Sequence, residues 1–133
     1  MNSGRLSLDQ APPISVPLRF FLTAPLFGIA TGTALAVMGG SALTSRWTGA
    51  MLGLTHAFVL GVIVMVALGA LQQMLPVVAG APLARASALS AFVHVGWTFG
   101  SASLAIGLGL ERRSLIAAGG LLLMTAGITF AAE

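Results

Sequence analysis

Charged side chains divide this sequence into long uncharged stretches. The charged residues are six arginines and three acids: Arg5, Asp9, Arg19, Arg46, Arg85, Glu111, Arg112, Arg113 and Glu133. A helix that crosses a bilayer needs about 20 apolar residues, and residues 20–45, 86–110 and 114–132 each supply such a run. Residues 47–84 are long enough for one further helix and a connection. The spacing therefore predicts four membrane-spanning helices.

The composition supports a membrane environment. Charged residues make up 7% of the chain and hydrophobic residues 57%, whereas a soluble domain carries about 25% charged residues. Too few polar side chains are present to cover an apolar core in water, so lipid is the solvent that this chain fits. We expect an integral membrane protein of a bacterial inner (plasma) membrane.

The apolar runs and their flanking residues give the expected helix boundaries. We expect an all-α fold, an integral membrane four-helix bundle formed by residues 17–133 after a flexible N-terminal tail at 1–16, with helices at about 17–38, 47–75, 86–110 and 114–131. Pro76 is expected near the end of the second helix because proline has no N–H to donate. An even number of spans puts both termini on the same side. Three arginines fall on each side, so the positive-inside rule gives no orientation.

The basic character of the chain does not indicate nucleic-acid binding. Its net charge is +3, but the arginines are spread over helix ends, where such residues meet lipid headgroups. The absence of cysteine excludes disulfides, thiolate zinc sites and Cys-ligated iron–sulfur clusters. No acid lies within a predicted span, which disfavours a transporter that exchanges protons at a buried carboxylate.

The two histidines, His56 and His94, are the only ionisable residues inside the predicted spans. Each lies about eight residues into a helix, and the two helices start from opposite faces, so both rings are predicted at similar depth near the membrane middle. Hydroxyl residues at helical spacing form a polar stripe through His94: Ser87, Ser90, Thr98 and Ser101. The neighbours of His56 at similar spacing are apolar residues or glycine.

Two interpretations of these histidines remain open. Each ring could make an interhelical hydrogen bond, or the pair could hold a cofactor. Intramembrane ionisable residues mark function by default, and imidazole without cysteine suits haem iron or copper. A matched pair favours the cofactor interpretation.

Small residues mark places where helices approach closely. Three GxxxG pairs occur, one on each of the first three predicted helices: Gly28 and Gly32, Gly49 and Gly53, Gly96 and Gly100. Gly61 and Gly69 lie two turns apart on the second helix. Such residues let helix backbones pack closely in lipid. Ordinary bundle packing is the simpler interpretation, and close approach of a planar cofactor or a neighbouring subunit is the alternative.

The second helix also carries a pattern seen in a known family. Thr55-His56-Ala57-Phe58, within HAFVLG and followed by GALQQMLPV at 69–77, resembles the haem-ligand helix of subunit I in the haem–copper oxidase superfamily. It is similar to small haem–copper membrane proteins linked to nitric-oxide response. Subunit I has three arcs of four helices, so the resemblance implies a single four-helix arc that assembles as a homotrimer.

The resemblance also implies a cofactor and its ligands. It implies haem b with two axial histidines, His56 and His94, contributed by one chain or by two neighbouring chains. The residues expected to line the pocket are Gly53, Gly61, Ser90 and Thr98. Copper on the same histidines, aided by Met51 or Met65, is the alternative.

Departures from the family limit the expected function. There is no tyrosine, His94 has no adjacent histidine, and no acid provides a proton route through the membrane. An oxygen reductase is therefore not expected, and we expect no catalytic residue. The expectation is a b-type haem protein for electron transfer or for sensing of haem or a gas, with an accessory membrane subunit as a further alternative. Its expected partners are lipid, further copies of itself and a redox protein or quinone. Gln72 and Gln73 could bind that quinone or reach the membrane interface, and the interface is favoured.

Overall fold

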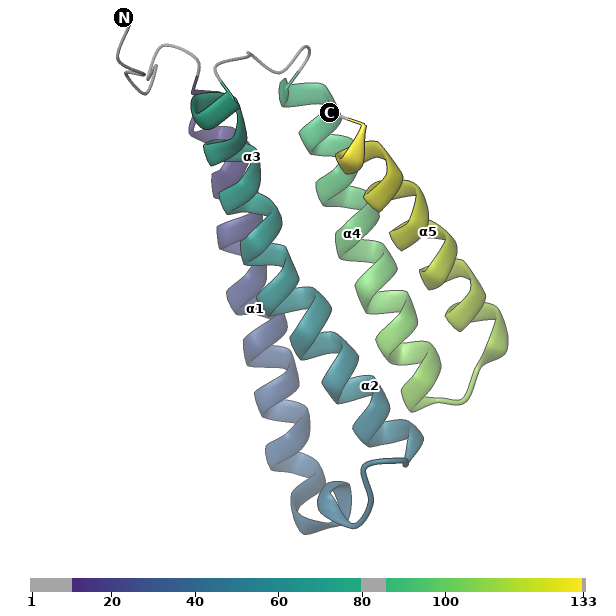
Figure 1. The fold of residues 1–133 in the computed structure, drawn as a ribbon. Helices are drawn as coiled ribbons and strands as arrows, with labels where there is room; N and C mark the ends of the chain where they lie inside the picture. The colour runs from purple at the N-terminus through teal and green to yellow at the C-terminus, as the bar shows by residue number, and fades with distance from the viewer. Residues whose placement is uncertain (1–10, 80–85, 133) are drawn as a thin grey trace, which may run out of the picture.

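The computed structural model describes residues 11–79 and 86–132, and this part of the chain is helical with short connections (Figure 1). The elements are α1 Ser15–Met38, the 3₁₀ helix η2 Gly39–Leu43, α2 Gly49–Phe58, the π-helical η3 Val59–Val64, α3 Met65–Ala79, α4 Ala86–Gly109 and α5 Arg113–Ala131. Most of the expected tail at 1–16 and most of the expected connection at 77–85 lie outside the described residues.

Four helical spans are long and apolar enough to cross a membrane. α2, η3 and α3 together form one of them, Gly49–Val78. Large apolar side chains cover the outside of the molecule, as expected where lipid is the solvent. The predicted all-α class and the four spans are confirmed.

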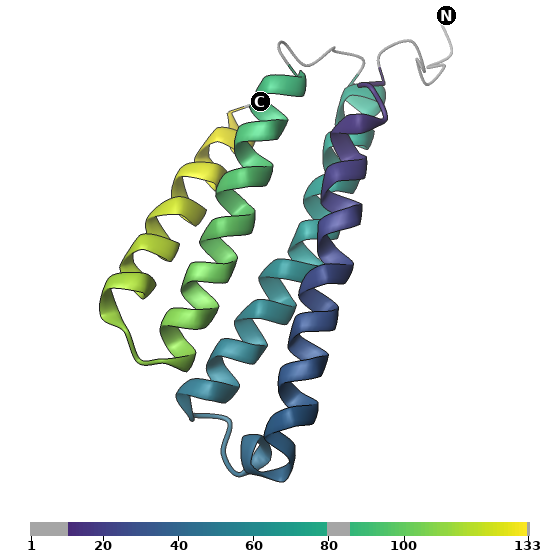
Figure 2. The same cartoon turned by 180° about the vertical axis from the view of Figure 1, so that it is seen from behind.

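Three of the spans contact one another, and the fourth lies beside them. α1, the span formed by α2, η3 and α3, and α4 pack together, and α5 packs along α4. The two views agree that α5 lies at one edge and α1 at the other (Figure 1, Figure 2). Ser15 and Ala131, the outer ends of the first and last helices, lie at the same end of the molecule, as the even number of spans predicts. The core lies where α1, α3 and α4 meet, and it contains Phe20, Ala24, Met65, Leu68 and Val93.

Pro76 does not end its helix. It is buried inside α3, which continues to Ala79, whereas the sequence predicted a stop near Leu75. A proline removes one backbone hydrogen bond, and in a membrane helix neighbouring groups offset such losses. Here the loss falls close to the described end of the helix, where few backbone bonds remain to be disrupted.

Glycines set the closest helix contacts. A Cβ on Gly53 would lie 2.6 Å from the carbonyl oxygen of Ala105 on α4. On the opposite face of α4, a Cβ on Gly100 would lie 2.9 Å from the side chain of Leu123 on α5. Two of the three GxxxG pairs therefore pack helices of the same chain, which is the simpler of the two interpretations.

The π-helical segment exposes a backbone group that a neighbour uses. The indole N–H of Trp97 on α4 donates to the carbonyl of Leu60, with an N···O distance of 3.0 Å. Wider π turns free carbonyls from the regular α-helical pattern, and such segments are frequent at functional sites. This one begins directly after α2, the helix that carries His56.

Candidate functional site

The imidazole of His56 has one nitrogen fixed by its own helix and one left open. Its Nδ1 lies 2.8 Å from the carbonyl oxygen of Leu52, one turn earlier. A carbonyl can only accept, so Nδ1 carries the proton and Nε2 presents a lone pair. This is the tautomer that a metal-binding histidine needs, with the second nitrogen held by a carbonyl.

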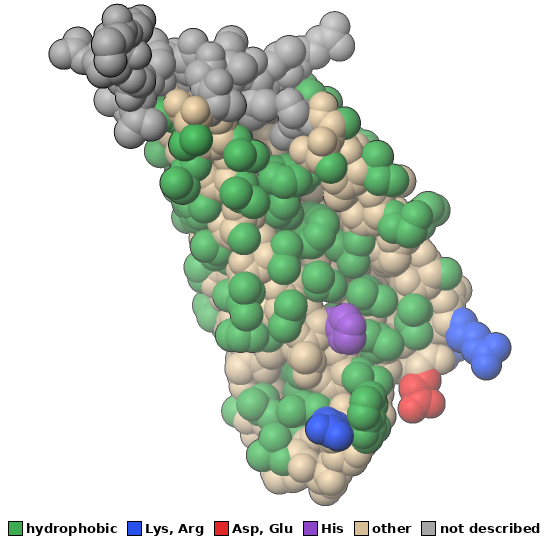
Figure 3. Space-filling view, in the orientation of Figure 1, with side chains coloured by type: hydrophobic (Ala, Val, Ile, Leu, Met, Phe, Trp, Pro, Cys, Tyr) green, Lys and Arg blue, Asp and Glu red, His purple; other side chains and the backbone are tan. Residues whose placement is uncertain are grey.

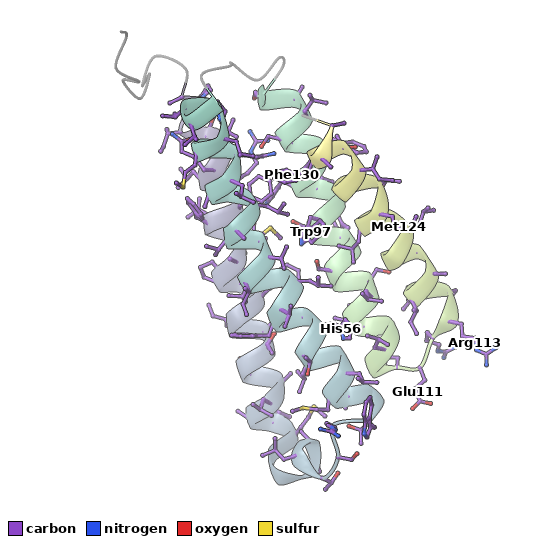
Figure 4. The ribbon with its side chains drawn as sticks, viewed as in Figure 1. His56, Trp97, Glu111, Arg113, Met124 and Phe130 are labelled. Atoms are coloured by element: carbon purple, nitrogen blue, oxygen red, sulfur yellow. The ribbon has the colours of Figure 1, made fainter. Side chains whose placement is uncertain are left out.

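The ring of His56 is half-buried and accessible from one face of the molecule. A histidine is visible there between apolar side chains (Figure 3), at the place labelled His56 in Figure 4. Within the described part of the chain, the bond to Leu52 is the only hydrogen bond that the His56 side chain makes. An interhelical hydrogen bond therefore does not explain why a histidine occupies this position.

The side chain of His94 joins α4 to α1. Its Nε2 lies 2.8 Å from Oγ1 of Thr23 on α1. The Thr23 hydroxyl donates its proton to the carbonyl of Arg19 at 2.8 Å, so it must accept from His94 and Nε2 carries the proton. The ring also meets Phe20 edge-on, with ring centroids 5.0 Å apart. His94 is thus the interhelical hydrogen-bonding histidine that the simpler interpretation describes.

The two histidines do not lie at one depth. The Trp97–Leu60 hydrogen bond fixes the register of α4 against the helix of His56. His56 precedes Leu60 by four residues and His94 precedes Trp97 by three. Because the helices are antiparallel, the offsets add to seven residues, or about 10 Å along the axis. Side chains lean toward the N-terminus of their own helix, which moves the rings further apart.

The predicted common depth is therefore wrong. Both histidines lie near the starts of helices that begin at opposite faces, and α4 alone has 24 residues, a length of about 36 Å. The prediction took the hydrocarbon thickness of about 30 Å as the whole separation. The extra helix length separates the two rings.

The four residues expected to line a shared pocket are not brought together. The Ser90 hydroxyl donates to Oε1 of Gln72 at 2.8 Å, and the Thr98 hydroxyl donates to the carbonyl of His94 at 2.7 Å. Gly61 faces the ring of Phe27 on α1, which fills the space a cofactor would need. Gly53 lines a separate groove, away from the other three residues.

An apolar groove of about 470 Å³ lies between α1, α2 and α4. Small residues form more than half of its wall: Ala30, Ala34, Ala50, Gly53, Ala57, Ala102, Ala105 and Gly109. Its size is in the range of small-molecule pockets. However, the only side-chain hydroxyl on its wall, Thr31, donates to the carbonyl of Phe27. The groove offers a mostly hydrocarbon surface, and the Met38 thioether is the one side-chain group on its wall that can bind a metal.

The polar stripe on α4 leads into the protein interior. Gln72 is 1% exposed and its side chain accepts a hydrogen bond from Ser90. The favoured prediction, that Gln72 reaches the membrane interface, is therefore wrong. Its position is explained by the facing serine, because a buried amide needs partners in an apolar interior. The hydroxyl of Ser101, fully buried, has no hydrogen-bond partner among the described residues.

Three contributors to these contacts were not anticipated from the sequence. Thr23 binds His94, Trp97 binds the π-helical segment, and Arg46 stacks over the Trp47 ring at 5.2 Å. Thr23 follows Ser15 and Arg19 at four-residue spacing on α1, and this polar spacing was the signal that could have marked it. Arg46 was placed at a helix end, which is correct, but its pairing with Trp47 was not foreseen.

Of the two histidines, His56 alone keeps a ring nitrogen available for a metal. His56 offers an open Nε2 and a largely apolar surround, which suits a porphyrin. The copper alternative needs His56 and His94 on one ion, and their separation of about 10 Å along the helix axis is too large for a shared copper within one chain. No group of three or more His, Cys, Asp or Glu residues occurs in the described ranges. Comparison of the chain with family models, curated proteins and solved structures found no match.

Proposed function

We propose that this chain is a b-type haem protein of a bacterial inner membrane, and that His56 is the axial ligand. The observation that carries the proposal is the open Nε2 of a histidine whose Nδ1–H is bound to Leu52. An imidazole nitrogen that has no partner in lipid is costly, so a ligand on Nε2 would give that nitrogen the partner that the protein does not supply. The haem supplies an iron atom for electron transfer or for binding a small gas.

The proposal differs from the bis-histidine site expected from the family resemblance. The Nε2 of His94 is occupied by Thr23, and its ring lies on the order of 10 Å from the depth of His56. A cyclic assembly around the membrane normal keeps every residue at its depth, so a neighbour's His94 would have the same offset. With one histidine ligand, the second axial position is free, which favours sensing of a diatomic gas over electron transfer.

We further propose that the protein assembles as a homotrimer. Support comes from the arrangement of the helices, because α1 and α5 lie at opposite edges of the molecule and each presents a face to a neighbouring copy. Identical chains that assemble most often form closed rings. The number three comes from the family resemblance, in which one arc is a third of subunit I.

Visible spectroscopy of the purified protein tests the haem proposal. The protein, expressed with haem supply, should show a Soret band and bind haem in about a 1:1 ratio. The band should be lost in His56→Leu and retained in His94→Leu, which changes the same residue type on the neighbouring span. Carbon monoxide should shift the reduced Soret band of the wild type, because one axial position is free.

Three results would overturn the proposal or part of it. A colourless protein after haem addition would exclude haem binding. Equal loss of the band in both variants would restore the bis-histidine site. Metal analysis that finds copper without iron would favour the copper alternative.

A further inference from the structure

His56 lies close to one end of its span. Gly49, the first residue of α2, precedes it by seven residues, or about 10 Å. The other end of the span, Val78, follows it by 22 residues, or about 33 Å.

This position matters for a cofactor that carries acid groups. Haem b has two propionates that are charged at neutral pH, and a charged carboxylate inside the hydrocarbon is strongly unfavourable. A haem on His56 must therefore direct both propionates toward the nearer end, where α2 begins. The residues at that end determine whether the carboxylates find partners.

Arg46 is the cation best placed for this role. It lies in the connection just before α2, is exposed, and stacks on Trp47 with its guanidinium 5.2 Å from the ring centroid. Stacking on an aromatic ring orders the guanidinium while leaving its N–H donors free. Within the described ranges, Arg46 makes no ion pair or side-chain hydrogen bond that would compete for those donors. A basic side chain is visible below the histidine on the same face (Figure 3).

Glu111 places a negative charge at this end, and it would repel the carboxylates of a haem. A Cβ on Gly49 would lie 3.4 Å from Oε1 of Glu111, so this carboxylate lies beside the first turn of α2. Arg112 and Arg113 follow it in the turn to α5. Arg113 is labelled at the outer edge of α5, far across the view from His56 (Figure 4).

We propose that Arg46, ordered by Trp47, binds the propionates of a haem held by His56, and that Glu111 opposes their binding. The inference rests on the proposed haem function and adds a cofactor-binding residue and an orientation to it. The cofactor class that the end of α2 recognises is a porphyrin with acidic substituents.

Transfer of haem from the purified holoprotein to excess apomyoglobin tests this assignment. Arg46→Gln should release haem about three- to tenfold faster than the wild type. The lower value corresponds to the loss of an exposed charged hydrogen bond, and the higher value to the loss of a partly desolvated one. Glu111→Gln should release haem more slowly than the wild type. Arg113→Gln, the matched control, should release it at the wild-type rate. The effect of Arg46→Gln should shrink as salt is raised, because exposed charges are screened.

A second measurement separates binding from stability. The haem dimethyl ester, which has no free carboxylates, should be released at the same rate from the wild type and from Arg46→Gln. Equal release of haem b from wild type, Arg46→Gln and Arg113→Gln would overturn the assignment of Arg46 and leave His56 as ligand. Failure of the wild type to bind haem would overturn the proposed function itself.

Discussion

Two residues of one type take different roles because their surroundings differ. The proton of His94 is on Nε2 and is accepted by Thr23, whereas the proton of His56 is on Nδ1 and is accepted by Leu52. The first ring joins two helices, and the second leaves a lone pair available. Residue type alone does not distinguish the two, but their hydrogen-bond partners do, because only His56 keeps its Nε2 available.

Removing the partner of His94 should destabilise the fold. Thr23→Val leaves a ring N–H without an acceptor in an apolar region, which should cost about 1–3 kcal/mol of unfolding free energy. Denaturation in detergent micelles, followed by circular dichroism, measures this. Thr125→Val is the control, because that exposed hydroxyl bonds only to its own helix. Similar effects of the two substitutions would contradict the role given to Thr23.

Two buried serines on α4 should respond in opposite directions. Ser90→Ala removes a donor to Gln72 and should lower the unfolding free energy by about 1 kcal/mol. Ser101→Ala removes a buried hydroxyl that has no partner among the described residues. Its loss should leave stability unchanged or raise it slightly. The same denaturation experiment compares them, and a large destabilisation by Ser101→Ala would indicate a hydrogen bond that the structure does not contain.

At the scale of helices, the span that carries His56 is the least regular. It begins as an α-helix, widens into six π-helical residues, and resumes as an α-helix. The π-helical segment changes the direction in which the residues after it point, relative to the residues before it. Gly53 can therefore pack on α4 while Gly61 and Gly69 pack on α1.

A methyl group at the α2–α4 contact should separate the two helices. Gly53→Ala would place a Cβ 2.6 Å from the backbone oxygen of Ala105 and 3.1 Å from the nitrogen of Gly109. Rigid backbone atoms cannot yield as a side chain does, so we expect a loss of about 1–3 kcal/mol. Gly120→Ala has no atom within 4 Å of the added methyl and should be tolerated. Thermal unfolding in micelles compares the two, and an equally stable Gly53→Ala protein would contradict the close packing.

The sequence predicts the ends of the helices better than it predicts the contacts between them. Arginines and acids locate the helix ends within a few residues because a charge cannot enter lipid without cost. The register between helices is not encoded locally, so the separation of His56 from His94 and the bond from Trp97 to Leu60 were not predictable. The π-helical segment also leaves no mark in a run of apolar residues such as VLGVIV.

The molecule as a whole presents two unpaired edges. α1 exposes Leu22, Leu26 and Ile29, and α5 exposes Leu121, Met124 and Ile128, each more than 60% accessible. In a ring of copies, the α1 edge of one chain meets the α5 edge of the next. The contact is heterologous, so it closes only if the rotation between copies is an exact fraction of a turn.

Cysteine cross-linking checks this arrangement against a background free of native cysteines. Thr23 lies level with His94, and Gly100 faces Leu122 and Leu123, which puts Leu26 and Met124 at similar depth. The double variant Leu26→Cys/Met124→Cys should form ladders up to three chains upon oxidation in membranes. Each single variant should remain largely uncross-linked. Ladders absent from the double variant, together with a monomeric mass by native mass spectrometry, would contradict the ring.

The position of His56 along its span has an electrical consequence. It lies roughly a quarter of the way along the 30 residues from Gly49 to Val78. A full elementary charge that crosses the membrane gains or loses about 2.3 kcal/mol per 100 mV. An electron that reached an iron on His56 from the nearer face would cross only about a quarter of that field, or about 0.6 kcal/mol per 100 mV. From the opposite face, the same step would work against most of the membrane voltage, so the cofactor would be electrically coupled to one side of the membrane far more than to the other.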